Sequence, residues 1–381
     1  MRRLLLGWCL VFGLSLSGLS SSGEEPVRSD PDAIRTQLKD RMEQAVRAEK
    51  FRGAVLVTRG GEPWLRAGYG LASEELQVPN TPETKFRLGS ITKQFTAMAI
   101  LILQERGKLQ VADPISKHLA DTPKAWEGIT IHHLLTHTSG IPNFTSFPDY
   151  LSTMAQPSPP AKTLLRFKDK PLDSPPGSKH QYSNSGYIVL GLIIEKAAGR
   201  SYDSFLREAI FDPLAMRDTG YDQPRVVIAR RAQGHGRFLG ILQNAQYIDM
   251  SIPHAAGALY STVDDLSKWD QALNTEKLIP RAMIEKMFTP DKNNYAYGWV
   301  VIRREGRPTI HLHGGGINGF VTDIARSPDE KICIVVLCND ESLSPTRLRD
   351  DLARILLGIK AKDKAEEPTK GKAPAKVEGK P

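Results

Sequence analysis

Residues 90–105 read Ser-Ile-Thr-Lys-Gln-Phe-Thr-Ala-Met-Ala-Ile-Leu-Ile-Leu-Gln-Glu, with neither glycine nor proline. Apolar residues recur at positions 95, 98, 99, 102 and 103, which predicts a helix with one apolar face. Ser90 and Lys93 open this helix three residues apart, so they share a face. A lysine amine placed there can take the proton of a serine hydroxyl, and a helix N-terminus favours the developing anion. Alone, Ser-x-x-Lys is weak evidence, because serine is a common N-cap.

Two further motifs follow along the chain. Tyr182-Ser183-Asn184 comes directly after a turn-rich stretch at residues 175–178, and His313-Gly314-Gly315 follows an alternating stretch that predicts a strand. Ser-x-x-Lys, Tyr-x-Asn and His-x-Gly, in that order, resemble the serine β-lactamase and penicillin-binding-protein superfamily, and within it the class C-like branch. Further segments that resemble the family are residues 86–93, 134–142, 256–262 and 297–299. The resemblance covers roughly residues 32–358.

The resemblance and the chemistry of these side chains imply an acyl-transfer enzyme. Ser90 would attack a carbonyl carbon and form an acyl-enzyme. Lys93 and Tyr182 would share the proton transfers, and the sequence leaves open which of the two is the general base. Asn184 would hold both Lys93 and an amide or carbonyl of the substrate.

His313 and the glycines after it form the third part of the predicted site. The backbone N–H groups of Ser90 and Gly316 should form the oxyanion hole, and Gly314, Gly315 and Gly316 should let substrate approach the edge strand. His313 stands where the lactamases carry lysine, and a neutral imidazole grips a carboxylate less firmly than an ammonium. We therefore expect carboxylate-free esters to be better substrates than β-lactams, with carboxylates favoured more as pH falls below about 6.5.

The hydropathy pattern places strands at both ends of the chain and helices between them. Helices are predicted at residues 32–50, 185–198, 202–210 and 345–357, and strands at 53–59, 64–71, 297–303, 309–313, 320–326 and 331–338. We expect an α/β (α+β), β-lactamase/transpeptidase-like fold, with one antiparallel sheet built from both chain ends, flanked by helices, and a mostly helical lobe inserted. The catalytic domain would span residues 24–359, with the sheet lobe at about 32–85 and 255–358 and the helical lobe at about 86–254.

The two chain ends differ in composition from the rest. Met1-Arg2-Arg3, an apolar run at residues 4–19 and small residues after it predict a signal peptide at residues 1–23, hence a secreted or periplasmic protein. A membrane anchor at residues 4–19 is the alternative. Residues 360–381 carry seven lysines against four acidic residues and almost no large apolar residue, so we expect a disordered basic tail. Weak contact of this tail with cell-wall or membrane surfaces is a secondary expectation.

Other classes of protein fit less well. The net charge of +8 comes largely from the two ends of the chain. The charge that remains is modest, so the sequence does not indicate a nucleic-acid-binding surface. His132, His133 and His137 lack a zinc motif such as His-Glu-x-x-His, so we expect neither metal nor cofactor. An α/β-hydrolase would need Gly-x-Ser-x-Gly, which is absent, and would place a glycine run before its nucleophile. Cys333 and Cys338 lie five apart on one predicted strand, face opposite sides, and are expected to be buried thiols.

We therefore expect a secreted serine hydrolase that acts through an acyl-enzyme on a small ester, amide or D-amino-acid peptide. Its expected partner is a small-molecule or peptide substrate, with no nucleic acid. The alternative is a catalytically silent module that binds peptidoglycan or penicillin on the same scaffold. The presence of Ser90, Lys93, Tyr182 and Asn184 together argues against that alternative.

Overall fold

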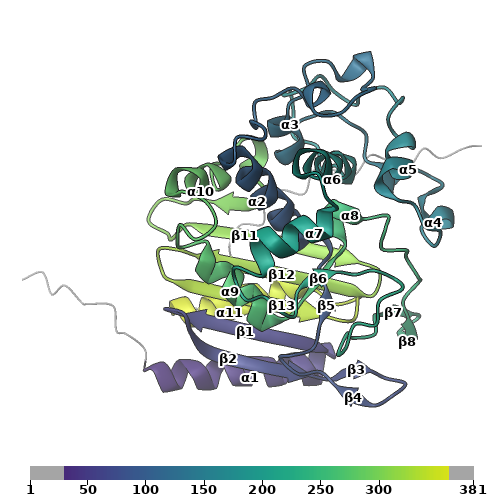
Figure 1. The fold of residues 1–381 in the computed structure, drawn as a ribbon. Helices are drawn as coiled ribbons and strands as arrows, with labels where there is room; N and C mark the ends of the chain where they lie inside the picture. Colours follow the sequence, from purple (N-terminus) through teal and green to yellow (C-terminus); the bar gives the residue numbers. More distant parts are fainter. Residues whose placement is uncertain (1–29, 360–381) are drawn as a thin grey trace, which may run out of the picture.

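A six-stranded antiparallel sheet built from both ends of the chain is the centre of the fold (Figure 1). The computed structural model describes residues 30–359. The strand order is β10 (Val300–Ile302), β11 (Ile310–Ile317), β12 (Phe320–Ser327), β13 (Ile332–Cys338), β1 (Gly53–Arg59) and β2 (Glu62–Tyr69). The N-terminal hairpin β1–β2 pairs with β13, in a register that runs from Gly53 opposite Cys338 to Arg59 opposite Ile332. The predicted mixed fold, with its sheet drawn from both ends, is confirmed.

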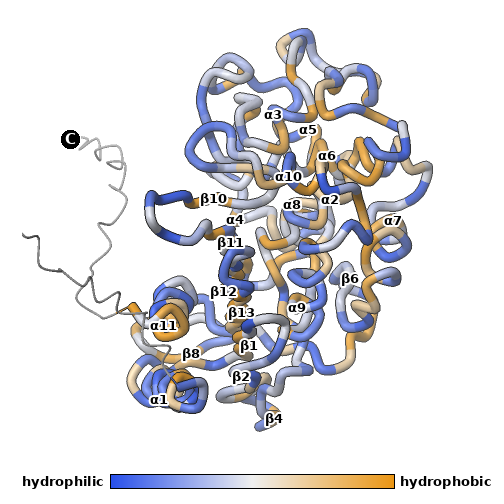
Figure 2. Tube along the Cα trace, turned by 90° about the vertical axis from the view of Figure 1, so that its left-hand side faces the viewer, coloured by the Kyte–Doolittle hydropathy of each residue, from blue (hydrophilic) through white to orange (hydrophobic). Residues whose placement is uncertain are grey.

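Helices cover both faces of this sheet. Val55 and Val57 of β1 pack in one apolar cluster with α1 (Pro31–Glu49) and α11 (Pro345–Leu357). Ala54 and Leu56 belong to a second cluster, which contains α2 (Thr92–Glu105) and α9 (Val263–Ala272). Figure 2 shows α1 and α11 on one side of β13 and β1, and α9 on the other. Because both faces are covered, every residue of β13 is buried, as its unbroken apolar sequence requires.

The inserted lobe packs the long helix α6 and several short helices around α2. Its helices are α3 (Ile131–Leu135), α4 (Tyr150–Thr153), α5 (Pro160–Leu165), α6 (Asn184–Ala198), α7 (Tyr202–Leu206) and α8 (His254–Gly257), and α10 (Arg281–Met287) follows α9. Its strands are β5 (Phe86–Arg87), β6 (Gly220–Tyr221) and β9 (Leu259–Ser261), which form a small sheet, and the hairpin β7 (His235–Phe238)–β8 (Ile241–Asn244). A further hairpin, β3 (Leu71–Ser73)–β4 (Val78–Pro79), lies after β2. Residues 92–103 of α2 are all buried, so this helix is the shared core of both lobes.

Several element ends differ from the sequence-based expectation. Strand β11 was expected to end at His313 but continues through the three glycines to Ile317. The strand expected at residues 297–303 is reduced to β10, because Gly298, at φ +75°, turns the chain just before it. Cys333 and Cys338 are free, buried thiols in opposite apolar clusters, as expected.

The predicted signal peptide at residues 1–23, the alternative anchor at residues 4–19 and the basic tail at residues 360–381 lie outside the described residues. Among residues 30–359, no helix has the length and apolar character needed to span a bilayer.

Candidate active site

Ser90 lies in a tight 3₁₀ turn, Gly89–Ile91, that leads directly into α2. Gly89 adopts φ +54°, a conformation that favours glycine, and a Cβ there would stand 2.8 Å from the backbone nitrogen of Gly316. The backbone of this turn therefore approaches the backbone of β11 closely. That approach brings the turn that carries Ser90 next to Gly316, and the oxyanion hole at their N–H groups stays a prediction.

The amine of Lys93 stands at the centre of the site. Its Nζ lies 3.0 Å from Ser90 Oγ, 2.9 Å from Asn184 Oδ1 and 2.8 Å from the carbonyl oxygen of Ala256. The side chain is fully buried and forms no ion pair with any described residue, and burial lowers the pKa of Lys93 well below its ordinary value. A neutral amine has two N–H groups and one lone pair. The two carbonyl oxygens can take the N–H groups, which leaves the lone pair for the Ser90 hydroxyl.

Tyr182 contacts the same hydroxyl from another side. Its OH donates to Ser90 Oγ at 2.7 Å, and burial raises the pKa of Tyr182 above its ordinary value, so the phenol keeps its proton. The ring of His137 lies against the Tyr182 ring, with centroids 4.2 Å apart, and His137 Nδ1 accepts from the backbone N–H of Ser183 at 3.1 Å. His137 therefore braces the loop that carries Tyr182.

Asn184 is held by contacts at both ends of its amide. It is the first residue of α6, its Oδ1 faces Lys93, and its Nδ2 donates to Thr145 Oγ1 at 3.1 Å. Its backbone N–H donates to Asn143 Oδ1 at 3.0 Å. The loop at residues 143–145 thus fixes the side chain that orients the lysine.

His313 lies on β11 directly before the glycines, as expected, but its ring makes contacts within the protein that the sequence did not suggest. The imidazole is buried, its Nδ1 donates to the carbonyl of Gly314 at 2.7 Å, and its Nε2 lies 2.9 Å from the hydroxyl of Tyr295. Burial lowers the pKa of His313 to about 4. The ring stays neutral through the range in which we expected it to charge, and both nitrogens already have partners inside the protein. This geometry leaves no free ring nitrogen of His313 for the expected contact with a substrate carboxylate.

The glycines of β11 also serve different purposes. A Cβ on Gly315 would stand 1.9 Å from the carbonyl oxygen of Leu88, so this glycine permits the strand to pack under the nucleophile turn. The expectation that Gly315 clears space for substrate is wrong. A Cβ on Gly316 would meet nothing within 4 Å, and Gly316 lines the pocket beside Ser90. Gly316 thus leaves open space beside Ser90, and its expected role as an oxyanion donor stays a prediction.

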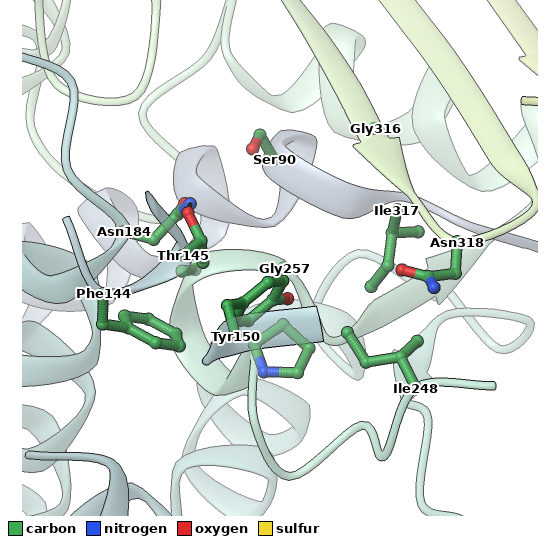
Figure 3. Close-up of a pocket in the computed structure, with 12 residues that line it drawn as sticks. Ser90, Phe144, Thr145, Tyr150, Asn184, Ile248, Gly257, Gly316, Ile317 and Asn318 are labelled. Carbon is green, nitrogen blue, oxygen red and sulfur yellow. Dashed lines mark hydrogen bonds between the residues drawn. The ribbon is translucent and has the colours of Figure 1, made fainter. Parts of the chain in front are cut away.

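A pocket of about 190 Å³ opens beside the nucleophile (Figure 3). Asn184 and Thr145 lie on one side of it, and Ile317, Asn318 and Ile248 lie on the other. The complete lining is Ser90, Phe144, Thr145, Tyr150, Asn184, Ile248, Pro253, Ala256, Gly257, Gly316, Ile317 and Asn318.

Sequence reasoning missed most of this wall, and it missed the Ala256 carbonyl as a partner of Lys93. The only available signal was position, since Ile317 and Asn318 directly follow the glycine run.

The histidines considered as metal ligands have other partners. His132 Nδ1 lies 2.9 Å from the hydroxyl of Tyr297, and His133 Nδ1 accepts from the backbone N–H of Thr130 at 3.2 Å. Within residues 30–359, no group of three or more His, Cys, Asp or Glu side chains is placed to hold a metal ion.

The sheet, the inserted helical lobe and the Ser-x-x-Lys turn define a protein of the serine β-lactamase and transpeptidase fold. The chain belongs to the Beta-lactamase family, which it matches over residues 38–358. It is 30% identical over 327 residues to Penicillin-binding protein 4* of Bacillus subtilis (strain 168), a match that covers 81% of this chain and 72% of that protein.

Solved structures agree with this assignment. An octameric penicillin-binding protein homologue from Pyrococcus abyssi superposes with a TM-score of 0.76 at 29% identity, over 85% of this chain and 77% of that one. A D-stereospecific amidohydrolase from Streptomyces sp. superposes with a TM-score of 0.70 over 84% of this chain and 98% of that one. At 24% identity, this second likeness is one of fold.

Proposed function

We propose that this chain is a serine hydrolase that forms an acyl-enzyme on Ser90 and acts on a small ester, amide or D-amino-acid peptide. One observation carries the proposal: a buried Lys93 amine, with no ion-pair partner among residues 30–359, lies 3.0 Å from the Ser90 hydroxyl in a chain of this family. A lysine that is kept neutral by burial is a base, whereas a charged surface lysine is not.

The geometry favours Lys93 as the general base. Its lone pair takes the Ser90 proton while Oγ attacks the carbonyl carbon of the substrate. The backbone N–H groups of Ser90 and Gly316 stabilise the oxyanion, and each such donor is worth about 3 kcal/mol of barrier. Tyr182, which remains protonated, donates its proton to the leaving atom and takes back the proton that Lys93 holds. Water then attacks the carbonyl carbon of the ester on Ser90 and gives its proton to Lys93; the bond from that carbon to Ser90 Oγ breaks, and Lys93 passes the proton to Oγ as the acid leaves.

The proposal also places the enzyme outside the cytoplasm, secreted or periplasmic. Support comes from the sequence of residues 1–23, a basic start followed by an apolar run and small residues. N-terminal sequencing of native protein tests it, since a mature start between about residues 20 and 25 is expected and a retained Met1 would favour an anchor.

Weak surface contact of the tail at residues 360–381 is a lesser part of the proposal. Removing those residues and measuring binding to cell walls and anionic vesicles tests it.

Covalent labelling tests the nucleophile. Ser90→Ala should remove fluorophosphonate and penicillin labelling, and turnover should fall on the order of 10⁶-fold. Ser183→Ala is the matched control, because Ser183 lies between Tyr182 and Asn184 in the chain, is buried, and its hydroxyl has no hydrogen-bond partner among the described residues. Intact-mass and peptide analysis should place the adduct on Ser90. An adduct on Ser139 or Ser183 would contradict the assignment. Labelling of Ser90 without turnover of any ester, amide or D-peptide would support the binding-module alternative.

A further inference from the structure

The pocket beside Ser90 contains no charged side chain. Its wall is formed by the apolar or aromatic residues Phe144, Tyr150, Ile248, Pro253 and Ile317, and by the neutral polar residues Thr145, Asn184 and Asn318. A carboxylate or ammonium that entered would lose hydration without gaining an ion partner from this wall.

The cation behind the wall is already paired. Arg166 lies 6.0 Å from the centre of the Phe144 ring and forms an ion pair with Asp149 at 2.8 Å. Its charge is therefore compensated and does not attract a substrate anion into the pocket.

The pocket lies on the acyl side of the reacting bond. Its lining includes Ser90, Asn184 and Gly316 but not Tyr182, although Tyr182 also contacts Ser90 Oγ. In the proposed mechanism the leaving atom departs towards the Tyr182 hydroxyl, which supplies its proton. The part of the substrate that stays bound to Ser90, the acyl group, is then left facing the pocket.

The size of the pocket limits what the acyl group can be. A cavity of 150 Å³ lined by aliphatic and aromatic side chains can hold benzene, and this pocket measures about 190 Å³. Its far side is tied together, since Asn318 Nδ2 donates to the carbonyl of Gln246 at 3.0 Å and the backbone N–H of Asp249 donates to the carbonyl of Met154 at 2.9 Å. The turn after β11, the segment at residues 246–250 and the end of α4 thus form one connected wall.

We propose that the enzyme selects an uncharged, compact and apolar acyl group, of about four to six carbons or one aromatic ring, and that Ile248 and Ile317 set this limit. The selection rests on the proposed acyl-enzyme at Ser90. In this proposal the uncharged pocket wall, and not His313, is the reason why substrates with a carboxylate are disfavoured.

A series of p-nitrophenyl esters tests the selection, because the leaving group is constant and only the acyl group varies. The wild-type kcat/KM should peak at butyrate, hexanoate or benzoate and fall for decanoate. The mono-p-nitrophenyl ester of glutaric acid, close to hexanoate in size but with a terminal carboxylate, should react at least ~10-fold more slowly than hexanoate at pH 7.5. Ser90→Ala provides the background rate to subtract.

Two variants separate size from charge. Ile248→Ala should move the maximum of kcat/KM towards the decanoate ester, because the smaller side chain widens the pocket. Ile317→Lys should raise the kcat/KM of the glutarate ester relative to that of the hexanoate ester, because it adds a cation to the pocket wall. Ile241→Ala is the matched control, since Ile241 is an exposed residue of the β7–β8 hairpin, and its ester profile should equal that of wild type.

The outcomes distinguish the two proposals. Equal rates for glutarate and hexanoate esters, or a profile that Ile248→Ala leaves unchanged, would overturn the acyl selection while leaving the serine hydrolase intact. No turnover of any ester, with Ser90 unlabelled, would overturn the proposed function itself.

Discussion

Lys93 is an unusual lysine, because it is fully buried and no described carboxylate compensates it. Its lowered pKa means that the unprotonated, basic form is already present well below the pH at which an ordinary lysine loses its proton. The raised pKa of Tyr182 means that its proton-donating form persists above pH 10. The kcat/KM of the enzyme should therefore rise with pH along a limb that belongs to Lys93 and stay level through neutral and mildly alkaline pH.

Tyr182→Phe separates the roles of the two groups. We expect the loss of the proton donor to lower kcat/KM by roughly 10²- to 10⁴-fold, while the acidic limb of the pH profile remains because Lys93 is intact. Steady-state rates from pH 5 to 10 provide the measurement, and Tyr247→Phe, at an exposed tyrosine, is the control. If the acidic limb disappears with the Tyr182 hydroxyl, then Tyr182 and not Lys93 is the base.

Strand β11 shows how neighbouring residues of one element differ in purpose. Gly315→Ala would push a Cβ to within 1.9 Å of the Leu88 carbonyl and 2.3 Å of Thr322 Oγ1, so the nucleophile turn and the strand must separate. We expect this change to lower the free energy of unfolding by about 1–3 kcal/mol or more. Gly316→Ala points into open space and should change stability by less than about 1 kcal/mol, but its methyl group should lower kcat/KM by narrowing the pocket mouth.

Urea unfolding and ester hydrolysis on both variants check this contrast. Equal stabilities for the two variants would show that Gly315 is not packed against Leu88. Unchanged turnover in Gly316→Ala would show that this face of β11 does not meet the substrate.

The sequence predicted more of the fold than of the site's surroundings. Apolar residues marked β1, β12 and β13, as continuous runs in β1 and β13, but the continuation of β11 was hidden because glycine carries no hydropathy signal. Ser90, Lys93, Tyr182 and Asn184 could be chosen together because their motifs are local in sequence, and the structure brings them within hydrogen-bond distance. The burial of His313 and the Ala256 carbonyl at Lys93 could not be predicted, since both depend on contacts between segments distant in sequence.

The whole molecule should lose stability in mild acid. Burial lowers the pKa of His254 and of His313 to about 4, and that of His311 to about 3, whereas an unfolded histidine titrates near 6.5. Between these values the unfolded chain binds more protons, so each histidine lowers stability by up to about 1.4 kcal/mol per pH unit as pH falls below 6.5. Asp323, Asp270 and Glu195 oppose this trend, because burial raises the pKa of each carboxyl, that of Asp323 to about 6, but they are fewer than the histidines whose pKa is lowered by burial.

Urea midpoints measured at pH 7.5, 6.0 and 5.0 should therefore decrease in that order. His254→Asn should flatten the curve, since asparagine does not titrate and tolerates the φ of +37° at this position. A wild-type curve that is level from pH 7.5 to 5.0 would show that these imidazoles reach water in the folded protein.

The pairing of β1 with β13 also determines when the central sheet can be completed during synthesis. The hairpin β1–β2 leaves the ribosome early, yet its neighbour in the sheet is made only after the whole helical lobe and β10 to β12. Until then β1 is an apolar strand with one unpaired edge, and such an edge promotes aggregation with other incompletely folded chains. The proposed active site is also completed late, because Gly316 is synthesised more than two hundred residues after Ser90. A ribosome-bound fragment would therefore carry Ser90 without Gly316, the second proposed oxyanion donor, so the proposed activity should appear only after the C-terminal strands are synthesised.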